Sequence, residues 1–101
     1  MPKIHIITIH HDGTCTPEAA HVKRGHSIIW HSDECNWSIE FGQNHSPLAH
    51  ERYSGKLGTN VDGGLIRQDA LESHTYAYGV STVTSFGAAS ADPQIIVDKS
   101  R

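Results

Sequence analysis

The stretch Trp37-Ser38-Ile39-Glu40-Phe41 decides the fold class of this chain. Large hydrophobic side chains occupy every second position, and polar side chains occupy the positions between them. Successive side chains of a β-strand point to opposite faces, so this period of two predicts a strand with one buried face. We expect Trp37, Ile39 and Phe41 to enter a hydrophobic core, and Ser38 and Glu40 to face solvent.

Runs with a similar β-forming character lie on both sides of this stretch. They are residues 3–10, 22–25, 27–32, 75–80 and 94–98. Short strands separated by turn residues are typical of a β-sandwich or a β-barrel. The sequence therefore predicts an all-β fold of about seven to eight strands.

Two segments lack a clear strand pattern. Residues 42–60 are polar and rich in glycine and contain Pro47, so we expect one long polar loop there, with a single helical turn as an alternative for 49–53. Residues 65–72 could form a short helix, although no good capping residue precedes them.

The 101 residues, 37% of them hydrophobic, predict one domain over 1–101, because a chain of this length has room for a single core. Eight Lys and Arg against eleven Asp and Glu give a net charge of −3, which argues against a nucleic-acid partner. No apolar run approaches the roughly 20 residues of a membrane span. No apolar segment follows Met1 as in a signal peptide, so the chain as written is expected in the cytoplasm, although an exported mature form would look the same.

Nine histidines are many for a chain of this length, and protonation of all nine would reverse the sign of its net charge. They are interpreted as solvated surface residues, as metal ligands or as a response to pH. The two cysteines, Cys15 and Cys35, leave three readings open: one disulfide, two free thiols or part of a metal site.

Four short motifs follow one another along the chain: Val22-x-x-Gly25-x-x-Ile28-x-Trp30, Trp37-x-Ile39-x-Phe41, Tyr76-x-Tyr78-x-Val80 and Asp92-Pro93-x-Ile95-Ile96-Val97. In this order and spacing they resemble the cupredoxin family, and the resemblance covers most of the chain apart from 42–74. It implies a bacterial-type, cupredoxin-like Greek-key β-sandwich. An immunoglobulin-like sandwich is the main alternative, but its two cysteines lie further apart than Cys15 and Cys35.

The resemblance also implies where a blue-copper site would lie. Such a site needs two histidines and a cysteine thiolate, with a weak axial ligand. The positions that match the family's ligands hold Trp37, Val80 and Val83, and no histidine follows Val80 in the next residues. We therefore expect a member of this family that has lost its type 1 copper site.

Metal binding outside that site is a separate hypothesis. The resemblance places the turn after the first strand and the loop at 32–37 at the same end of the sandwich, where 81–92 also arrives. This would gather His10, His11, His31 and Cys35 as candidate ligands for copper or zinc. No cofactor is expected if these histidines are only surface residues.

The preferred hypothesis is a non-catalytic binding or interaction module, with 42–60 and 81–85 as contact surfaces for an unknown protein or small ligand. A homodimer formed through an exposed edge strand is one form of such an interaction. The alternative is the copper- or zinc-binding protein. A small enzyme with an unrecognised site is the second alternative, and the sequence offers no catalytic residues for it.

Overall fold

The computed structural model describes residues 3–42, 46–82 and 93–99, and these form an all-β fold. Their strands are β1 (Ile4–Ile9), β2 (Cys15–Thr16), β3 (Ala19–Val22), β4 (Ser27–His31), β5 (Trp37–Glu40), β6 (Arg52–Gly55), β7 (Asn60–Leu65), β8 (His74–Ala77), β9 (Gly79–Thr82) and β10 (Gln94–Val97). These ten outnumber the seven to eight predicted, because β2 has only two residues and β8 and β9 are separated by Tyr78 alone. No helix long and apolar enough to cross a membrane occurs in the described part of the chain.

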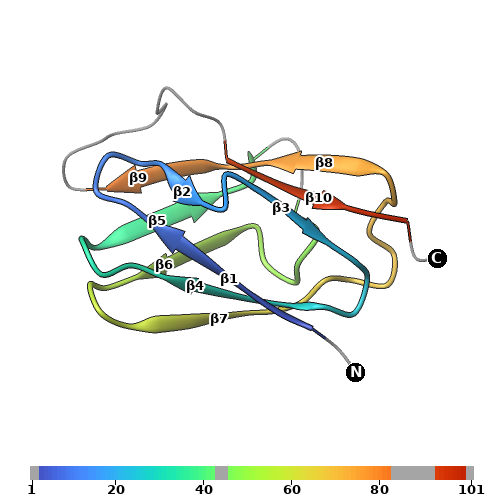
Figure 1. Cartoon of the computed structure of the whole chain (residues 1–101), viewed down its shortest axis with the longest axis horizontal. Helices are drawn as coiled ribbons and strands as arrows, with labels where there is room; N and C mark the ends of the chain where they lie inside the picture. The colour runs from blue at the N-terminus through green and yellow to red at the C-terminus, as the bar shows by residue number, and fades with distance from the viewer. Residues whose placement is uncertain (1–2, 43–45, 83–92, 100–101) are drawn as a thin grey trace.

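The first layer is a four-stranded sheet in the order β2-β1-β4-β7. β1 and β4 run parallel, and β7 pairs with β4 antiparallel, with an irregularity at Ile28 and Ile29. β7 lies below β4 in Figure 1, and β1 runs diagonally from the N-terminus to pair with β4. β2 and β7 are the two edges of this sheet.

The second layer combines two three-stranded sheets, β3-β10-β8 and β6-β5-β9. Because β9 continues β8 after one residue, the two sheets join along this line, which runs across the top of Figure 1. β3 and β10 are parallel, whereas the other pairs of this layer are antiparallel. The predicted two-sided packing of strands is thus present as several sheets around one core.

The core forms because alternate side chains of both layers point inward. Trp30 is fully buried at its centre, and its ring centroid lies 5.3 Å from that of Tyr78 and 5.8 Å from that of Tyr53. Trp37 and Phe41 lie 6.4 and 6.5 Å from the same ring. The predicted inward face of 37–41 is confirmed, since Trp37, Ile39 and Phe41 are all buried.

The prediction of one long loop over 42–60 is wrong for its second half. β6 occupies Arg52–Gly55 and β7 begins at Asn60, so no helical turn forms at 49–53. Tyr53 explains the difference, because its ring contacts Trp30 and its hydroxyl donates a hydrogen bond to the carbonyl of Gly63 at 2.9 Å. Packing against the core therefore overrides the polar, glycine-rich local sequence.

The short helix considered for 65–72 does not form either. Leu65 ends β7, and the Ile66 N–H donates to the carbonyl of His26 at 2.7 Å. Gly25 in turn donates to the carbonyl of Ile66 at 3.0 Å. The Arg24 guanidinium also donates two hydrogen bonds to the carbonyl of Ala70, at 2.6 and 2.8 Å. A helix over 65–72 would need the carbonyl of Ile66 for the N–H of Ala70, and here that carbonyl is taken by Gly25.

Candidate functional site

Two segments far apart in the sequence meet at one end of the sandwich, as predicted. The turn after β1 presents His10 and His11 to Glu34, which lies in the loop between β4 and β5. Glu34 Oε2 lies 3.0 Å from His10 Nδ1, and Glu34 Oε1 lies 3.8 Å from His11 Nε2. The end of β9 joins them, because the Thr82 hydroxyl donates to the carbonyl of His11 at 2.7 Å. We call His10, His11, Glu34 and Thr16 the polar cluster.

Glu34 is the anchor of the polar cluster. The backbone N–H of His11 donates to its Oε1 at 2.9 Å, and the His10 ring contacts its Oε2. These two bonds favour the carboxylate form, so the hydrogen bond from the His11 backbone, followed by that from His10, lowers the pKa of Glu34 below its ordinary value of 4.5. Glu34 therefore stays ionised and fixes the orientation of His10.

His10 bridges Glu34 and Thr16. Its Nδ1 faces the carboxylate, and its Nε2 lies 2.7 Å from the Thr16 hydroxyl oxygen. Thr16 is exposed on β2, where it pairs with Thr8 of β1. The sequence did not predict a role for Thr16, because nothing in the spacing of a single threonine indicates that its hydroxyl contacts His10 in the preceding turn.

The other two predicted metal ligands make different contacts. His31 Nε2 lies 2.8 Å from Asp33 Oδ1, and this hydrogen bond raises the pKa of His31 above 6.5. Cys35 is buried, with its Sγ 3.7 Å from the Ser32 hydroxyl oxygen. Across residues 3–42, 46–82 and 93–99, no group of three or more His, Cys, Asp or Glu side chains is arranged to hold a metal ion.

Both cysteines are free thiols, so the disulfide considered between Cys15 and Cys35 does not form in this structure. Cys15 is buried beside Tyr78, and burial raises the pKa of its thiol to about 11. A thiol in such surroundings stays protonated and is a poor metal ligand or nucleophile.

The positions expected for copper ligands belong to the core. Trp37 is 3% exposed and Val80 is 2% exposed. Ile39 pairs with Val80, and Trp37 pairs with Thr82 across the β5–β9 ladder. The third position, Val83, lies outside the described residues.

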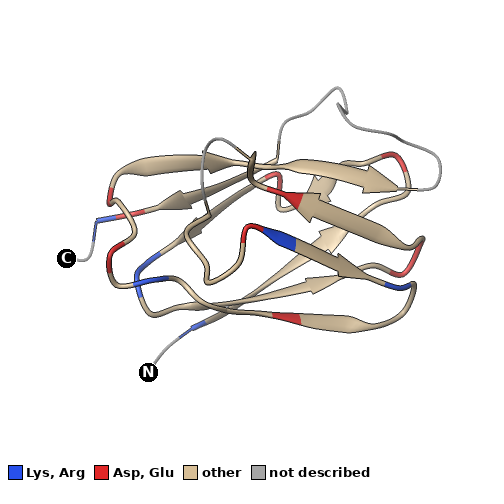
Figure 2. Ribbon diagram, turned by 180° about the vertical axis from the view of Figure 1, so that it is seen from behind, with Lys and Arg blue, Asp and Glu red and all other residues tan. Residues whose placement is uncertain are grey.

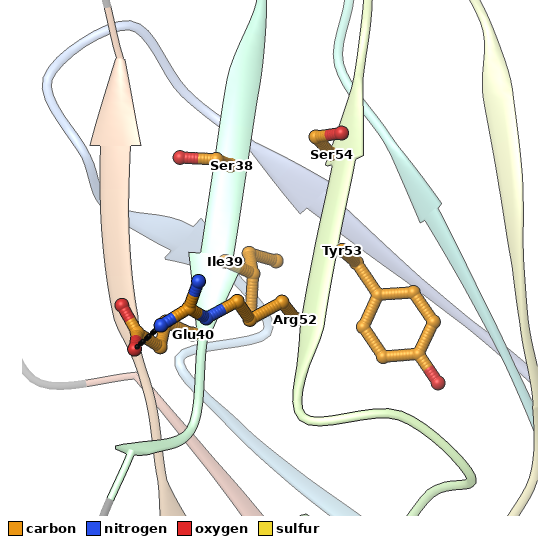
Figure 3. A pocket seen from close by; sticks show the side chains of 6 residues that line it. All are labelled: Ser38, Ile39, Glu40, Arg52, Tyr53 and Ser54. Carbon is orange, nitrogen blue, oxygen red and sulfur yellow. Dashed lines mark hydrogen bonds and ion pairs between the residues drawn. The ribbon is translucent and has the colours of Figure 1, made fainter.

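The outer face of the β6-β5-β9 sheet is polar and shallowly hollowed. One pocket of about 340 Å³ is lined by residues of β5 and β6, and Figure 3 shows Arg52 reaching across to Glu40. Their Nη2 and Oε2 atoms lie 3.0 Å apart. A neighbouring pocket of about 320 Å³ shares Ser38 and Glu40 and extends to Ser81. The predicted contact segments 42–60 and 81–85 thus contribute Arg52 and Ser81 to one face.

The outer face of the first sheet carries several exposed aliphatic side chains among polar ones. Ile4 and Ile6 point outward from β1 with exposed fractions of 60% and 57%, and Leu65 of β7 is 57% exposed. Ile29 of β4 pairs with Ile6 and is partly exposed. A pocket of about 310 Å³ lies between Ile4, Ile29 and Asp62. We call Ile4, Ile6, Ile29 and Leu65 the apolar face.

Comparisons with protein-family models and with curated proteins found no match for this chain.

Proposed function

We propose that the chain is a non-catalytic interaction module on a cupredoxin-like Greek-key β-sandwich, and that it associates with a second copy of itself through the apolar face. The parallel pairing of β1 with β4 and of β3 with β10, in two facing layers, supports this choice of sandwich. It favours this fold over immunoglobulin-like sandwiches, which are built from antiparallel sheets.

The copper positions support a module without a type 1 copper site. Type 1 copper needs imidazole and thiolate ligands, and an indole or an isopropyl group supplies neither. Trp37 and Val80 are instead buried side chains that fill the core at these positions. A fold can persist while its ancestral site is lost, so the function must be sought on the surface.

The apolar face is the observation that carries the proposal. Of the five large hydrophobic side chains that are exposed in the described residues, three lie on it: Ile4, Ile6 and Leu65. Isolated exposed hydrophobic residues are common on soluble proteins, but several of them on one face of a sheet favour an interaction surface. A partner that covered these side chains would remove the apolar area from water.

The register of Ile6 with Ile29 favours a second copy as the partner, because the same two side chains can cover each other across a two-fold axis. Lys3 precedes β1 and Asp62 lies on β7, and both are exposed. Asp62 is in register with Ile29 and Ile6, whereas Lys3 precedes the level of Ile4, Ser27 and Leu65, so the two charges lie at different levels along the strands. A two-fold axis parallel to the strands keeps each residue at its own level, so it would place Ile6 against the partner's Ile29.

Packing of faces is favoured over the edge-strand pairing that the sequence suggested. β7 is an edge of the first sheet, but its ladder to β4 is irregular at Ile28 and Ile29. Such irregularities twist an edge away from regular pairing with another strand. β2, the other edge, has only two residues and offers little length for a ladder.

Association is expected to be weak. Full burial of an isoleucine or leucine contributes about 1.5–3 kcal/mol, and the apolar face offers a few such side chains per copy. Association itself costs about 4–15 kcal/mol. The net free energy corresponds to a dissociation constant on the order of micromolar to millimolar.

Sedimentation velocity over a wide concentration range tests this proposal. The wild-type chain should show a dimer at high concentration, whereas Ile6→Lys should remain a monomer, because a lysine would be buried without a partner. Leu57→Lys is the matched control, since Leu57 is 53% exposed and lies outside the apolar face. A wild-type chain that stays monomeric, or equal effects of the two variants, would contradict the proposal.

A copper- or zinc-binding protein is the second candidate. The observation in its favour is that two imidazoles, those of His10 and His11, lie within 4.0 Å of one carboxylate. Titration with Zn²⁺ or Cu²⁺ alone distinguishes the candidates. Stoichiometric, colourless or pale binding that His11→Ala abolishes would favour the metal function. An intense blue band would contradict the expected loss of the type 1 copper site.

A further inference from the structure

The polar cluster contains a chain of three groups with complementary chemistry. A carboxylate (Glu34), an imidazole (His10) and a hydroxyl (Thr16) follow one another at 3.0 Å and 2.7 Å. They come from the loop after β4, the turn after β1, and β2. This sequence of acid, base and hydroxyl is the arrangement that activates a nucleophile in acyl-transfer sites.

The direction of the hydrogen bonds follows from the donors available. An ionised carboxylate only accepts hydrogen bonds, so His10 donates its Nδ1–H to Glu34. A neutral imidazole then carries a lone pair on Nε2. The Thr16 hydroxyl therefore donates its proton toward His10 Nε2, which leaves the lone pairs of its oxygen for an electrophile.

Backbone bonds hold the groups in this geometry. The His10 N–H donates to the carbonyl of Thr14 at 2.8 Å, and the carbonyl of His10 accepts from Gly13 at 2.9 Å. The second oxygen of Glu34 is held by the backbone N–H of His11. Thr16 lies in the β1–β2 ladder, in register with Thr8. The hydroxyl itself is on an exposed residue, so a reagent in solution reaches it.

We propose that Thr16 is a nucleophile that takes an acyl group from an activated ester or thioester. Its Oγ forms a bond to the carbonyl carbon while the proton passes to His10 Nε2. The bond between the carbonyl carbon and the leaving group then breaks, and the leaving group departs with the electron pair. Glu34 balances the charge of the imidazolium. The imidazolium of His10 then releases its proton to solvent. The product is an ester at Thr16, so the chain is acylated once without turnover, which is compatible with a non-catalytic module.

The donor class follows from the open setting of the site. An exposed hydroxyl has few neighbouring residues that could bind a substrate, so the acyl donor must be reactive by itself. An acyl donor whose leaving group is a stable anion needs no general acid to protonate that leaving group. Activated esters and thioesters meet this condition. This activity goes beyond the proposed self-association, since none of its three groups belongs to the apolar face.

The test uses p-nitrophenyl acetate as the acyl donor and the full chain as the acceptor. Release of p-nitrophenolate is followed by its absorbance, and the acetyl group is located by mass spectrometry of proteolytic peptides. The expected result is an ester at Thr16 that forms faster than acetylation of the lysines. Thr16→Val should abolish this label, and His10→Gln should slow it by about a hundredfold, a typical effect of losing a general base.

Two further variants separate activation from structure. Glu34→Gln should slow labelling of Thr16 by about tenfold, because the amide no longer balances an imidazolium. Thr8→Val, which removes the hydroxyl next to Thr16 in register, should leave labelling unchanged. Circular dichroism checks that each variant is folded. Acetyl groups found only on lysines or imidazoles, or equal labelling of Thr16 in the wild type and in His10→Gln, would overturn the proposal.

Discussion

Ser32 holds the loop that carries Glu34. Its hydroxyl is fully buried, donates to the carbonyl of Ile9 at 2.6 Å, and accepts from the N–H groups of Glu34 and Cys35 at 3.2 and 3.3 Å. One side chain thus joins the end of β1 to the loop after β4. The polar cluster depends on these hydrogen bonds, because Glu34 can contact His10 only while the loop after β4 is held against the end of β1.

Ser32→Ala should therefore destabilise the protein. The substitution leaves a buried carbonyl without its donor, which costs about 1–3 kcal/mol. Urea unfolding followed by tryptophan fluorescence measures the change. Ser38→Ala is the control, since Ser38 is exposed on β5 and its loss should change the free energy of unfolding by less than about 0.5 kcal/mol. Equal costs for the two variants would contradict this role of Ser32.

The His31–Asp33 pair gives a prediction about pH. The hydrogen bond to Asp33 raises the pKa of His31 above 6.5 in the folded protein. A raised histidine pKa stabilises the fold fully below the unfolded value, and this contribution is lost as the pH rises through the folded value. NMR titration of the His31 ring should give a pKa above 6.5, and Asp33→Asn should bring it back toward 6.5. An unchanged titration in Asp33→Asn would contradict the assigned cause.

Part of the polar cluster was predictable at the level of single residues, and part was not. The juxtaposition of His10 and His11 with the 32–37 loop was expected from the resemblance to the cupredoxin family. The contact between His10 and Thr16 did not, because it depends on the short β1–β2 pairing. The sequence also could not show that His31 contacts Asp33 while His10 contacts Glu34, since both carboxylates lie in the same loop.

The β6-β5-β9 sheet allows a prediction at the level of elements. A Cβ atom added at Gly55 of β6 would lie 2.5 Å from a carbon of the buried Trp37 ring. Gly55→Ala should therefore force the ring to move and cost about 1–3 kcal/mol of stability, as overpacked core positions do. Thermal unfolding measures the difference in stability from the wild type.

Gly79→Ala is the matched control for this substitution. Gly79 begins β9 on the other side of β5, and a Cβ atom there would meet nothing closer than 3.9 Å. Its substitution should be nearly neutral. If Gly55→Ala were also neutral, the close approach of β6 to Trp37 would not be a constraint of the fold.

Local alternation predicted the strands that have a clear inside and outside. The clearest is β5, where Trp37 and Ile39 are buried and Ser38 and Glu40 are exposed. β6 was not predicted because Tyr53 is its only buried residue, and one inward side chain does not produce an alternating hydrophobic pattern. The extent of β7 could not be predicted either, since its two adjacent glycines have no side chains that would continue such a pattern. Their pairing is decided by contacts with β4 and β5.

At the scale of the whole molecule, single basic and acidic positions are spread over the ribbon in Figure 2, without a block of one sign. Lys3 and Asp62 lie at different levels along the strands of the first sheet, so a two-fold axis parallel to the strands does not pair them. Lys3→Glu and Asp62→Lys should therefore each change the dimerisation constant only slightly. Sedimentation equilibrium at low salt measures the dimerisation constant of each variant.

A large change in either variant would contradict the two-fold arrangement of the two copies without excluding association through the apolar face. The effect of each single variant should be small, on the order of 0.2–1 kcal/mol, since both charges are exposed.

The most direct test of the proposed interaction module is a dilution series followed by methyl NMR. We predict that the methyl resonances of Ile4, Ile6, Ile29 and Leu65 shift together with concentration and fit one dimerisation constant. The resonances of Leu57 and Leu71, which are equally exposed elsewhere, should stay constant. Resonances of the apolar face that do not move with concentration, or shifts centred on another surface, would contradict the account.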